Sequence, residues 1–186
     1  MANNLQIFNN LRLLEDYNYN GKLDFLTKFN IINNLSQKKI IKISLNFGFK
    51  NIGFNKKQMV PFFMVLELIS NQKCVVTRSR KNIINLKIKK GGIVGCKVTL
   101  RNKNLFNFLD TLILALPRAE NFKLFNLKNK NKSNNFSTVL SDLFIFHSLE
   151  SVLVDYIKKL DINFIFNTVN NSEKKFLLTY FKIPVI

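Results

Sequence analysis

Three segments of the chain alternate apolar and polar residues, which is the pattern of half-buried strands. The pattern predicts strands over residues 41–47, 96–101 and 162–167, and Gly48 ends the first of them. The residues expected on the core side are Ile41, Ile43, Leu45 and Phe47 in the first segment, Cys96, Val98 and Leu100 in the second, and Ile162, Phe164 and Phe166 in the third. Each strand should therefore turn its polar residues away from the core.

Shorter segments predict further extended structure. Residues 74–79 indicate a strand that leaves the sheet through Arg78, Arg80 and Lys81, and residues 144–146 indicate a short strand. Residues 86–89 alternate apolar residues with lysines and indicate a cationic ribbon. A glycine cluster of Gly91, Gly92 and Gly95 follows, and it predicts a flexible loop that leads into the strand at 96–101.

Other segments have helical spacing of their apolar residues. The spacing predicts helices over 23–34, 56–70, 102–116 and 170–181, and a short helix over 152–160. Pro61 fits only the first turn of its helix, so the regular part of that helix should begin near Met59. Pro117 ends the third helix, and the spacing of Asn170 and Glu173 is that of a capping box at the start of the last one.

The irregular mixture of strands and helices favours an α+β fold. We expect one domain with a largely antiparallel sheet and helices packed on one face. Residues 1–22 are interpreted as an N-terminal extension, and residues 23–186 as the domain itself. The segment 126–135, NLKNKNKSNN, is too polar to bury and is interpreted as a solvated loop, with a basic loop that orders against RNA as the alternative.

The charge of the chain points to a polyanionic partner. The 29 Lys and Arg residues against 11 Asp and Glu residues give a net charge of +18. A codon bias toward A and T would enrich Lys, but it should not remove Asp and Glu. Nucleic acid and an anionic membrane surface both remain candidates. No apolar run is long enough to span a bilayer, and the N-terminus has neither a signal-peptide nor a transit-peptide pattern.

Catalysis and metal binding are not expected. His147 is the one histidine and lies in an apolar run, while Cys74 and Cys96 are isolated and are interpreted as buried, reduced thiols. The glycine cluster precedes a strand and lacks the Lys-Ser or Lys-Thr pair of a phosphate-binding loop. We therefore expect no enzyme activity, no cofactor and no metal.

The polar sides of the predicted strands combine cations, hydroxyls and amides, which suits RNA better than other polyanions. A single such face could be an ordinary solvated surface, but the pattern recurs in three strands. Neutralising about six phosphates would give a slope of log K against log salt on the order of −4 to −5. The candidate RNA-binding residues are Lys42, Ser44, Asn46, Lys73, Thr77, Arg78, Arg80, Lys81, Lys97, Thr99 and Arg101.

Two motifs resemble the large-subunit ribosomal protein L5 family: NQKCVVTRSRKNIINLKIKKGGIVGCKVTLR at 71–101 and FLDTLILALPRAENF at 108–122. The resemblance covers nearly everything after Leu26 and implies an α+β fold whose open sheet face binds 5S rRNA in the central protuberance, next to other proteins of that region. It implies RNA contacts for Gln72 and for the candidates above, with the exception of Lys42, Ser44 and Lys97.

The resemblance also implies that a loop at 83–95 reaches P-site tRNA and a protein of the small-subunit head. The loop residues in question are Asn85, Lys87, Lys89, Lys90, Gly91 and Gly92. Cys74 and Asn85 replace a proline and a glycine of the family pattern, so the loop's flexibility could differ.

The A/T-biased composition resembles that of proteins encoded in a mitochondrial genome. We therefore expect a protein of the mitochondrial matrix that is encoded in the organelle, with a plastid as the alternative. Another rRNA segment could take the place of 5S rRNA in such a ribosome. The competing function is a free basic module that binds RNA or a membrane surface.

Overall fold

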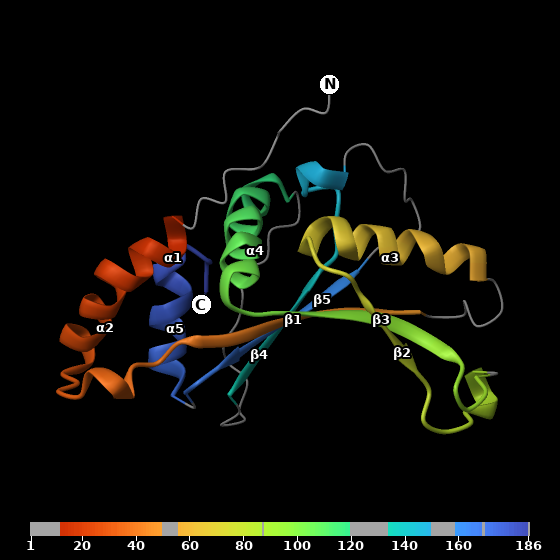
Figure 1. Ribbon diagram of the computed structural model, residues 1–186, viewed down its shortest axis with the longest axis horizontal. Helices are drawn as coiled ribbons and strands as arrows, with labels where there is room; N and C mark the ends of the chain where they lie inside the picture. Colours follow the sequence, from red (N-terminus) through yellow and green to blue (C-terminus); the bar gives the residue numbers. More distant parts are fainter. Residues whose placement is uncertain are drawn as a thin grey trace. The chain divides into compact units, whose positions relative to one another are not determined.

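The computed structural model describes residues 12–49, 56–86, 88–119, 134–149, 159–168 and 170–185. A five-stranded sheet has the order β2-β3-β1-β5-β4 (Figure 1). Its strands are β1 (Ile40–Gly48), β2 (Val75–Arg78), β3 (Ile93–Leu100), β4 (Asn135–Leu140) and β5 (Leu160–Phe166). β3 pairs antiparallel with both β1 and β2. This antiparallel sheet with its helices confirms the predicted α+β fold class.

The helices of the described residues are α1 (Arg12–Asp16), α2 (Lys22–Phe29), α3 (Lys56–Ser70), α4 (Asn102–Ala115) and α5 (Asn171–Tyr180). A π-helical turn, Tyr17–Gly21, joins α1 to α2. Short 3₁₀ turns lie at Asn34–Ser36, Ile84–Leu86, Leu116–Arg118 and His147–Leu149. No helix in these ranges has both the length and the hydropathy that a membrane span requires.

The chain forms two compact units. Unit 1 comprises Met1–Lys42, Arg101–Phe136 and Ile165–Ile186, and unit 2 comprises Ile43–Leu100 and Ser137–Phe164. The boundary between them falls inside β1, β4 and β5, so each unit contains part of all three strands.

The core of unit 2 lies between the sheet and α3. The predicted inward residues of β1 and β3, from Ile43 to Phe47 and from Cys96 to Leu100, are buried. α3 packs along this side of the strands (Figure 1), where the rings of Phe62 and Phe47 meet edge to face with centroids 5.7 Å apart. The alternation predicted for these strands is therefore confirmed. In unit 1 it breaks at Ile41, which is 44% exposed, because Ile40 takes the buried position.

α3 begins earlier than predicted. It is helical from Lys56, and Pro61 lies inside it instead of in its first turn. Proline removes one backbone hydrogen bond, but the helix continues because Met59, Phe62 and Val65 are buried on its apolar side.

The core of unit 1 is aromatic. The ring centroid of Tyr17 lies 5.5 Å from that of Phe181 and 6.3 Å from that of Phe106. The Tyr17 hydroxyl donates to the Lys38 carbonyl at 2.8 Å. Burial raises the pKa of Tyr17 to about 12. The described part of the predicted extension, residues 12–22, is thus helical and contributes Tyr17 to a core.

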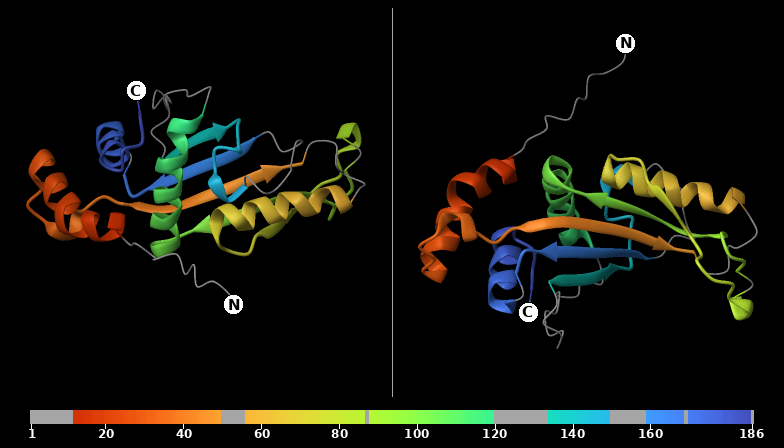
Figure 2. Two further views of the ribbon diagram at one scale, coloured as in Figure 1. Left: turned by 90° about the horizontal axis from the view of Figure 1, so that it is seen from above. Right: turned by 60° about the horizontal axis from the view of Figure 1, so that its bottom comes forward.

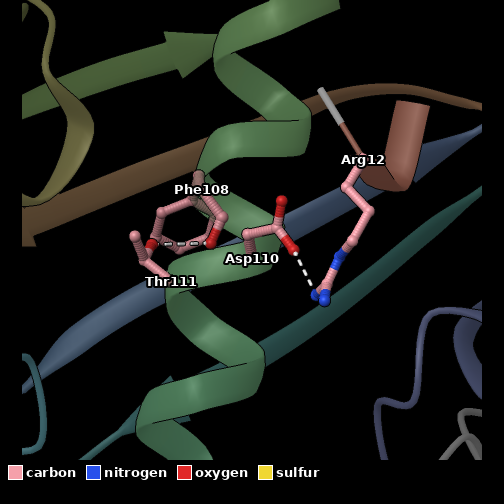
Figure 3. A network of polar contacts seen from close by, with 4 residues as sticks. All are labelled: Arg12, Phe108, Asp110 and Thr111. Atoms are coloured by element: carbon pink, nitrogen blue, oxygen red, sulfur yellow. Dashed lines mark hydrogen bonds and ion pairs between the residues drawn. The ribbon is translucent and has the colours of Figure 1, made fainter. Parts of the chain in front are cut away.

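A weak ion pair connects α1 to α4. Arg12 donates to Asp110 Oδ1 at 3.5 Å, and the hydroxyl of the next residue, Thr111, donates to the Phe108 carbonyl at 2.9 Å (Figure 3). Burial raises the pKa of Asp110, while Arg12 opposes that shift. Because the Arg12 side chain is mostly exposed, the pair stabilises unit 1 by less than about 1 kcal/mol.

Several predicted elements are wrong. Residues 144–146 form a turn before a 3₁₀ segment, and the strand of this region is β4. The first predicted helix does not reach Asn34, because α2 ends at Phe29 and Asn30 adopts a left-handed conformation with φ 49°. The described residues of the ribbon predicted over 86–89 are not paired as a ribbon: Leu86 ends the 3₁₀ turn Ile84–Leu86, and Ile88 makes an isolated bridge with Ile83.

The last predicted helix is confirmed as α5, but the capping box is not formed. The Asn170 side chain accepts no hydrogen bond from the backbone N–H groups of the first turn. Instead its amide donates to Glu173 Oε1 at 3.0 Å, and the Thr168 hydroxyl donates to the other carboxylate oxygen. Most of the predicted helix at 152–160 and most of the segment 126–135 lie outside the described residues. Lys87 lies outside them as well.

Candidate nucleic-acid interface

The polar residues of β1 and β3 share one side of the sheet in unit 2. In the antiparallel register Ser44 lies opposite Thr99, and Asn46 lies opposite Lys97. Directly opposed residues point to the same face, and the alternate residues of both strands are buried on the other face. Lys97 is exposed and the other three are half-buried. We call this surface the open face; its members are Ser44, Asn46, Gly48, Val75, Thr77, Gly95, Lys97, Thr99 and Asp161.

Asp161 belongs to the open face, although sequence reasoning did not identify it. The Asn46 side-chain amide donates through Nδ2 to Asp161 Oδ2 at 3.3 Å. This bond orients the amide, so that Asn46 Oδ1 remains as an acceptor. The signal was absent from the sequence because only the sheet order places β5 beside β1.

Two glycines leave part of the open face without projecting side chains, and we call this part of the surface low. Gly48 and Gly95 are opposite each other in the β1–β3 register, and Thr77 is opposite Gly95 in the next pairing. A Cβ added at Gly95 would lie 2.3 Å from the Phe47 carbonyl oxygen and 3.0 Å from Thr77 Oγ1, whereas one at Gly48 would have no atom within 4 Å. Gly95 is therefore part of β3 and serves close strand packing, not the flexible loop in which the sequence placed it.

The edge of unit 2 beside β2 carries Gln72 and Lys73, both exposed in the connection from α3. Gln72 Nε2 donates to the Thr99 carbonyl at 3.5 Å, so this amide also supports the connection.

The backbone N–H of Cys74 donates to Glu67 Oε1 at 3.0 Å. Burial, with a smaller contribution from Glu67, raises the pKa of Cys74 to about 11, and burial raises that of Cys96 to about 12. Both free cysteines are thus thiols at neutral pH, but Cys74 is only half-buried, contrary to the prediction.

A cationic hairpin extends from β2 and β3 (Figure 2). Arg78, Arg80 and Lys81 are exposed along its first arm. Its arms are held together because the Ser79 N–H donates to the Gly92 carbonyl and the Gly91 N–H donates to the Ser79 carbonyl, both at 2.9 Å. The base of the predicted loop is therefore structured.

The tip of this hairpin is the 3₁₀ turn Ile84–Leu86. Ile84 is 88% exposed, and Asn85 beside it is exposed as well. On the return arm Lys89 and Lys90 are exposed, and the backbone N–H of Lys90 donates to Asn82 Oδ1 at 2.6 Å. Gly91 has φ 81°, so the turn requires a residue that tolerates the left-handed region. The tip thus presents an apolar residue between basic arms.

The predicted RNA-binding residues do not all gather in one unit. Lys42 and Arg101 belong to unit 1, where both line a cavity, whereas the other candidates belong to unit 2. In the described ranges no group of three or more His, Cys, Asp or Glu residues could hold a metal ion. His147 is exposed in its 3₁₀ turn.

The chain is similar to known ribosomal proteins. The pattern of the ribosomal L5P family C-terminus matches residues 93–185. The large ribosomal subunit protein uL5m of Reclinomonas americana, a mitochondrial protein, is 36% identical over 177 residues, which cover 94% of this chain and 97% of the relative. Protein uL5 of Ehrlichia canis is 38% identical over 161 residues, 86% of this chain and 91% of the relative. Protein uL5 of Nitrosomonas europaea is 35% identical over 174 residues, 93% of this chain and 97% of the relative.

Proposed function

The chain belongs to the L5 family of large-subunit ribosomal proteins, and from this premise we propose that its open face binds ribosomal RNA in the central protuberance. Family membership makes it a structural component of the large subunit and not an enzyme. The RNA in our proposal is 5S rRNA or a segment of large-subunit rRNA that substitutes for it.

The observation that carries the proposal is the chemistry of the open face. Lys97 can neutralise a phosphate, while Ser44, Thr99 and Asn46 around it offer hydroxyl and amide groups. These groups suit the 2′-hydroxyls of an RNA minor groove, which is wide and shallow. The glycine pair keeps that part of the surface low, so that a duplex backbone can approach the strands.

We further propose that the hairpin of unit 2 reaches P-site tRNA and a protein of the small-subunit head. Its exposed lysines suit a phosphate backbone, and the exposed Ile84 at its tip suits a protein surface. Neighbouring proteins of the central protuberance complete the proposed set of partners.

The proposed location is the mitochondrial ribosome, with the protein encoded in the organelle. The relative from Reclinomonas americana supports an organellar ribosome. The A/T-biased composition supports an organellar gene, and a plastid is the second candidate.

Incorporation into the large subunit tests the proposal. Arg80→Glu combined with Lys97→Glu reverses two charges at the proposed interface, and Lys28→Glu with Lys175→Glu makes the same change on exposed lysines of unit 1. On sedimentation of organelle lysate, the first variant should be depleted from the large subunit and the control should remain. Equal incorporation of both variants would count against the proposal. The wild-type protein should detach only at high salt, whereas sedimentation with membranes would favour the competing module.

The identity of the RNA is tested by cross-linking. RNA cross-linked to peptides within residues 73–101 should map to 5S rRNA or to one compact segment of large-subunit rRNA. Cross-links scattered over unrelated RNAs would instead support a free RNA-binding module.

A further inference from the structure

The cavity of unit 1 has a shape and charge that the function proposed for unit 2 does not use. Its volume is about 770 Å³, within the range of small-molecule sites. Its walls are formed by α1, the π-helical turn, the chain leading into β1, the start of α4 and Phe181. All of the lining residues belong to unit 1.

The cavity is strongly cationic. Its lining includes Lys22, Lys39, Lys42, Arg101 and Lys103, and no Asp or Glu is among the lining residues. Arg101, Lys39 and Lys103 are exposed, while Lys22 and Lys42 are half-buried. Cations on a concave surface without carboxylates concentrate positive potential, so the occupant should be an anion.

The inner wall of the cavity is aromatic and apolar. Phe106 is half-buried, and its ring centroid lies 6.0 Å from that of Phe181 and 6.3 Å from that of Tyr17. Tyr17 and Phe181 are buried, line the same cavity and pack against the Phe106 ring. The exposed part of Phe106 therefore offers a supported surface for a planar group.

We propose that this cavity binds one unstacked nucleotide of single-stranded ribosomal RNA, with its base against Phe106 and its phosphates on the surrounding cations. The inference rests on the RNA-binding function proposed above and adds a second contact of a different kind. A base inside a duplex cannot enter a hollow, but an unpaired nucleotide in a loop or bulge can. Asn18, Gln37 and Asn102 also line the cavity and supply amides for a base edge or a ribose hydroxyl.

Binding of a labelled single-stranded RNA octamer to the full chain tests this inference by fluorescence anisotropy. Phe106→Leu keeps an apolar side chain but removes the stacking surface, so the affinity for the octamer should fall about tenfold. Lys103→Ala should weaken binding and reduce the salt slope by about 1, whereas Lys175→Ala, an exposed lysine of α5 outside the cavity, should do neither. The affinity for a duplex RNA should change little in Phe106→Leu.

Photocross-linking locates the bound nucleotide. An octamer that contains 4-thiouridine should cross-link to peptides around Tyr17 and Phe106, and Phe106→Leu should lose these cross-links. Octamer binding unaffected by Phe106→Leu and Lys103→Ala would overturn the inference. The proposed function would still stand if Arg80→Glu with Lys97→Glu abolished duplex binding, and it would fail separately if duplex binding persisted.

Competition experiments identify the source of the anion. The octamer should displace ATP and a poly-glutamate peptide from the cavity. Binding of ATP as tight as that of the octamer would assign the cavity to free nucleotides, and preferential binding of the acidic peptide would assign it to a protein partner. Either result would overturn the inference. Lys103→Ala changes an exposed side chain, so it keeps the test valid if Phe106→Leu fails to fold.

Discussion

The open face of unit 2 and the cavity of unit 1 carry the same sign of charge but differ in shape and in what surrounds the cations. On the open face, Lys97 stands among hydroxyls and amides on strands that two glycines keep low. In the cavity, five cations surround an aromatic wall. The low surface suits the backbone and ribose of a duplex, whereas the hollow suits a single base. Positive charge therefore predicts that RNA binds, and local shape predicts which form of RNA binds where.

The largest effect is expected for Gly95→Ala, because the new Cβ would lie 2.3 Å from the Phe47 carbonyl oxygen. The change should force β1 and β3 apart and lower the free energy of unfolding by about 1–3 kcal/mol or more. Gly48→Ala is the matched control in the opposite strand position, with no atom within 4 Å of the new Cβ, and should change stability by less than about 0.5 kcal/mol. Urea unfolding measures both, and equal stability of the two variants would contradict the close-packing role of Gly95.

Two substitutions at Asp161 test whether the open face distinguishes an RNA duplex from a DNA duplex through Asn46. Asp161→Ala removes the acceptor that orients Asn46, so the ratio of RNA-duplex to DNA-duplex affinity should fall several-fold. Asp161→Asn keeps an acceptor for that amide and should preserve the ratio. Both variants lose a negative charge and should bind each duplex more tightly. Dissociation constants for RNA and DNA duplexes of one sequence measure the effect, and identical ratios in the two variants would show that Asp161 does not orient the readout.

The smallest effect is expected at Asp110, where α4 meets α1 beside the cavity. Burial raises the pKa of this carboxyl, so its charged form costs stability at neutral pH and the cost disappears as pH falls through the raised pKa. Asp110→Asn removes both this cost and the weak pairing with Arg12. The variant should equal or exceed wild type at pH 7 by less than about 1 kcal/mol, and the difference should shrink toward pH 4. Thermal unfolding across this pH range checks the sign, and a difference that grew on acidification would refute it.

Much of the fold could be predicted because alternation and helical spacing respond directly to burial. β5 alternates buried and half-buried residues along its whole length, as its sequence indicates. β4 was missed because its sequence, NFSTVL, does not alternate apolar and polar residues regularly and follows a polar segment. Phe144 was placed in a strand because it lies in an apolar run, yet it is half exposed in a turn while Leu143 and Ile145 are buried. Apolar residues can be buried from a turn, and composition does not distinguish that case.

The site was harder to predict than the fold. Strand alternation placed Asn46, Lys97 and Thr99 on the outward side, and the structure has them there. Asp161 and the residues of the cavity come from segments far apart in the sequence, and local patterns do not show which of these segments meet. The cluster of Tyr17 with Phe106 and Phe181 shows the same limit, since residues 12–22 by themselves have no clear pattern.

In unit 1 the helices α1 and α2 pack against α5. Tyr180 donates its hydroxyl to Asp16 Oδ2 at 2.7 Å, and Phe25 lies 5.7 Å from Phe176 between ring centroids. A polypeptide emerges from the ribosome with its N-terminus first, so α1 and α2 are synthesised long before α5 exists. Unit 1 can therefore reach its native state only after α5 has been synthesised, and a nascent chain stalled before residue 170 should leave its early aromatic residues accessible to chaperones.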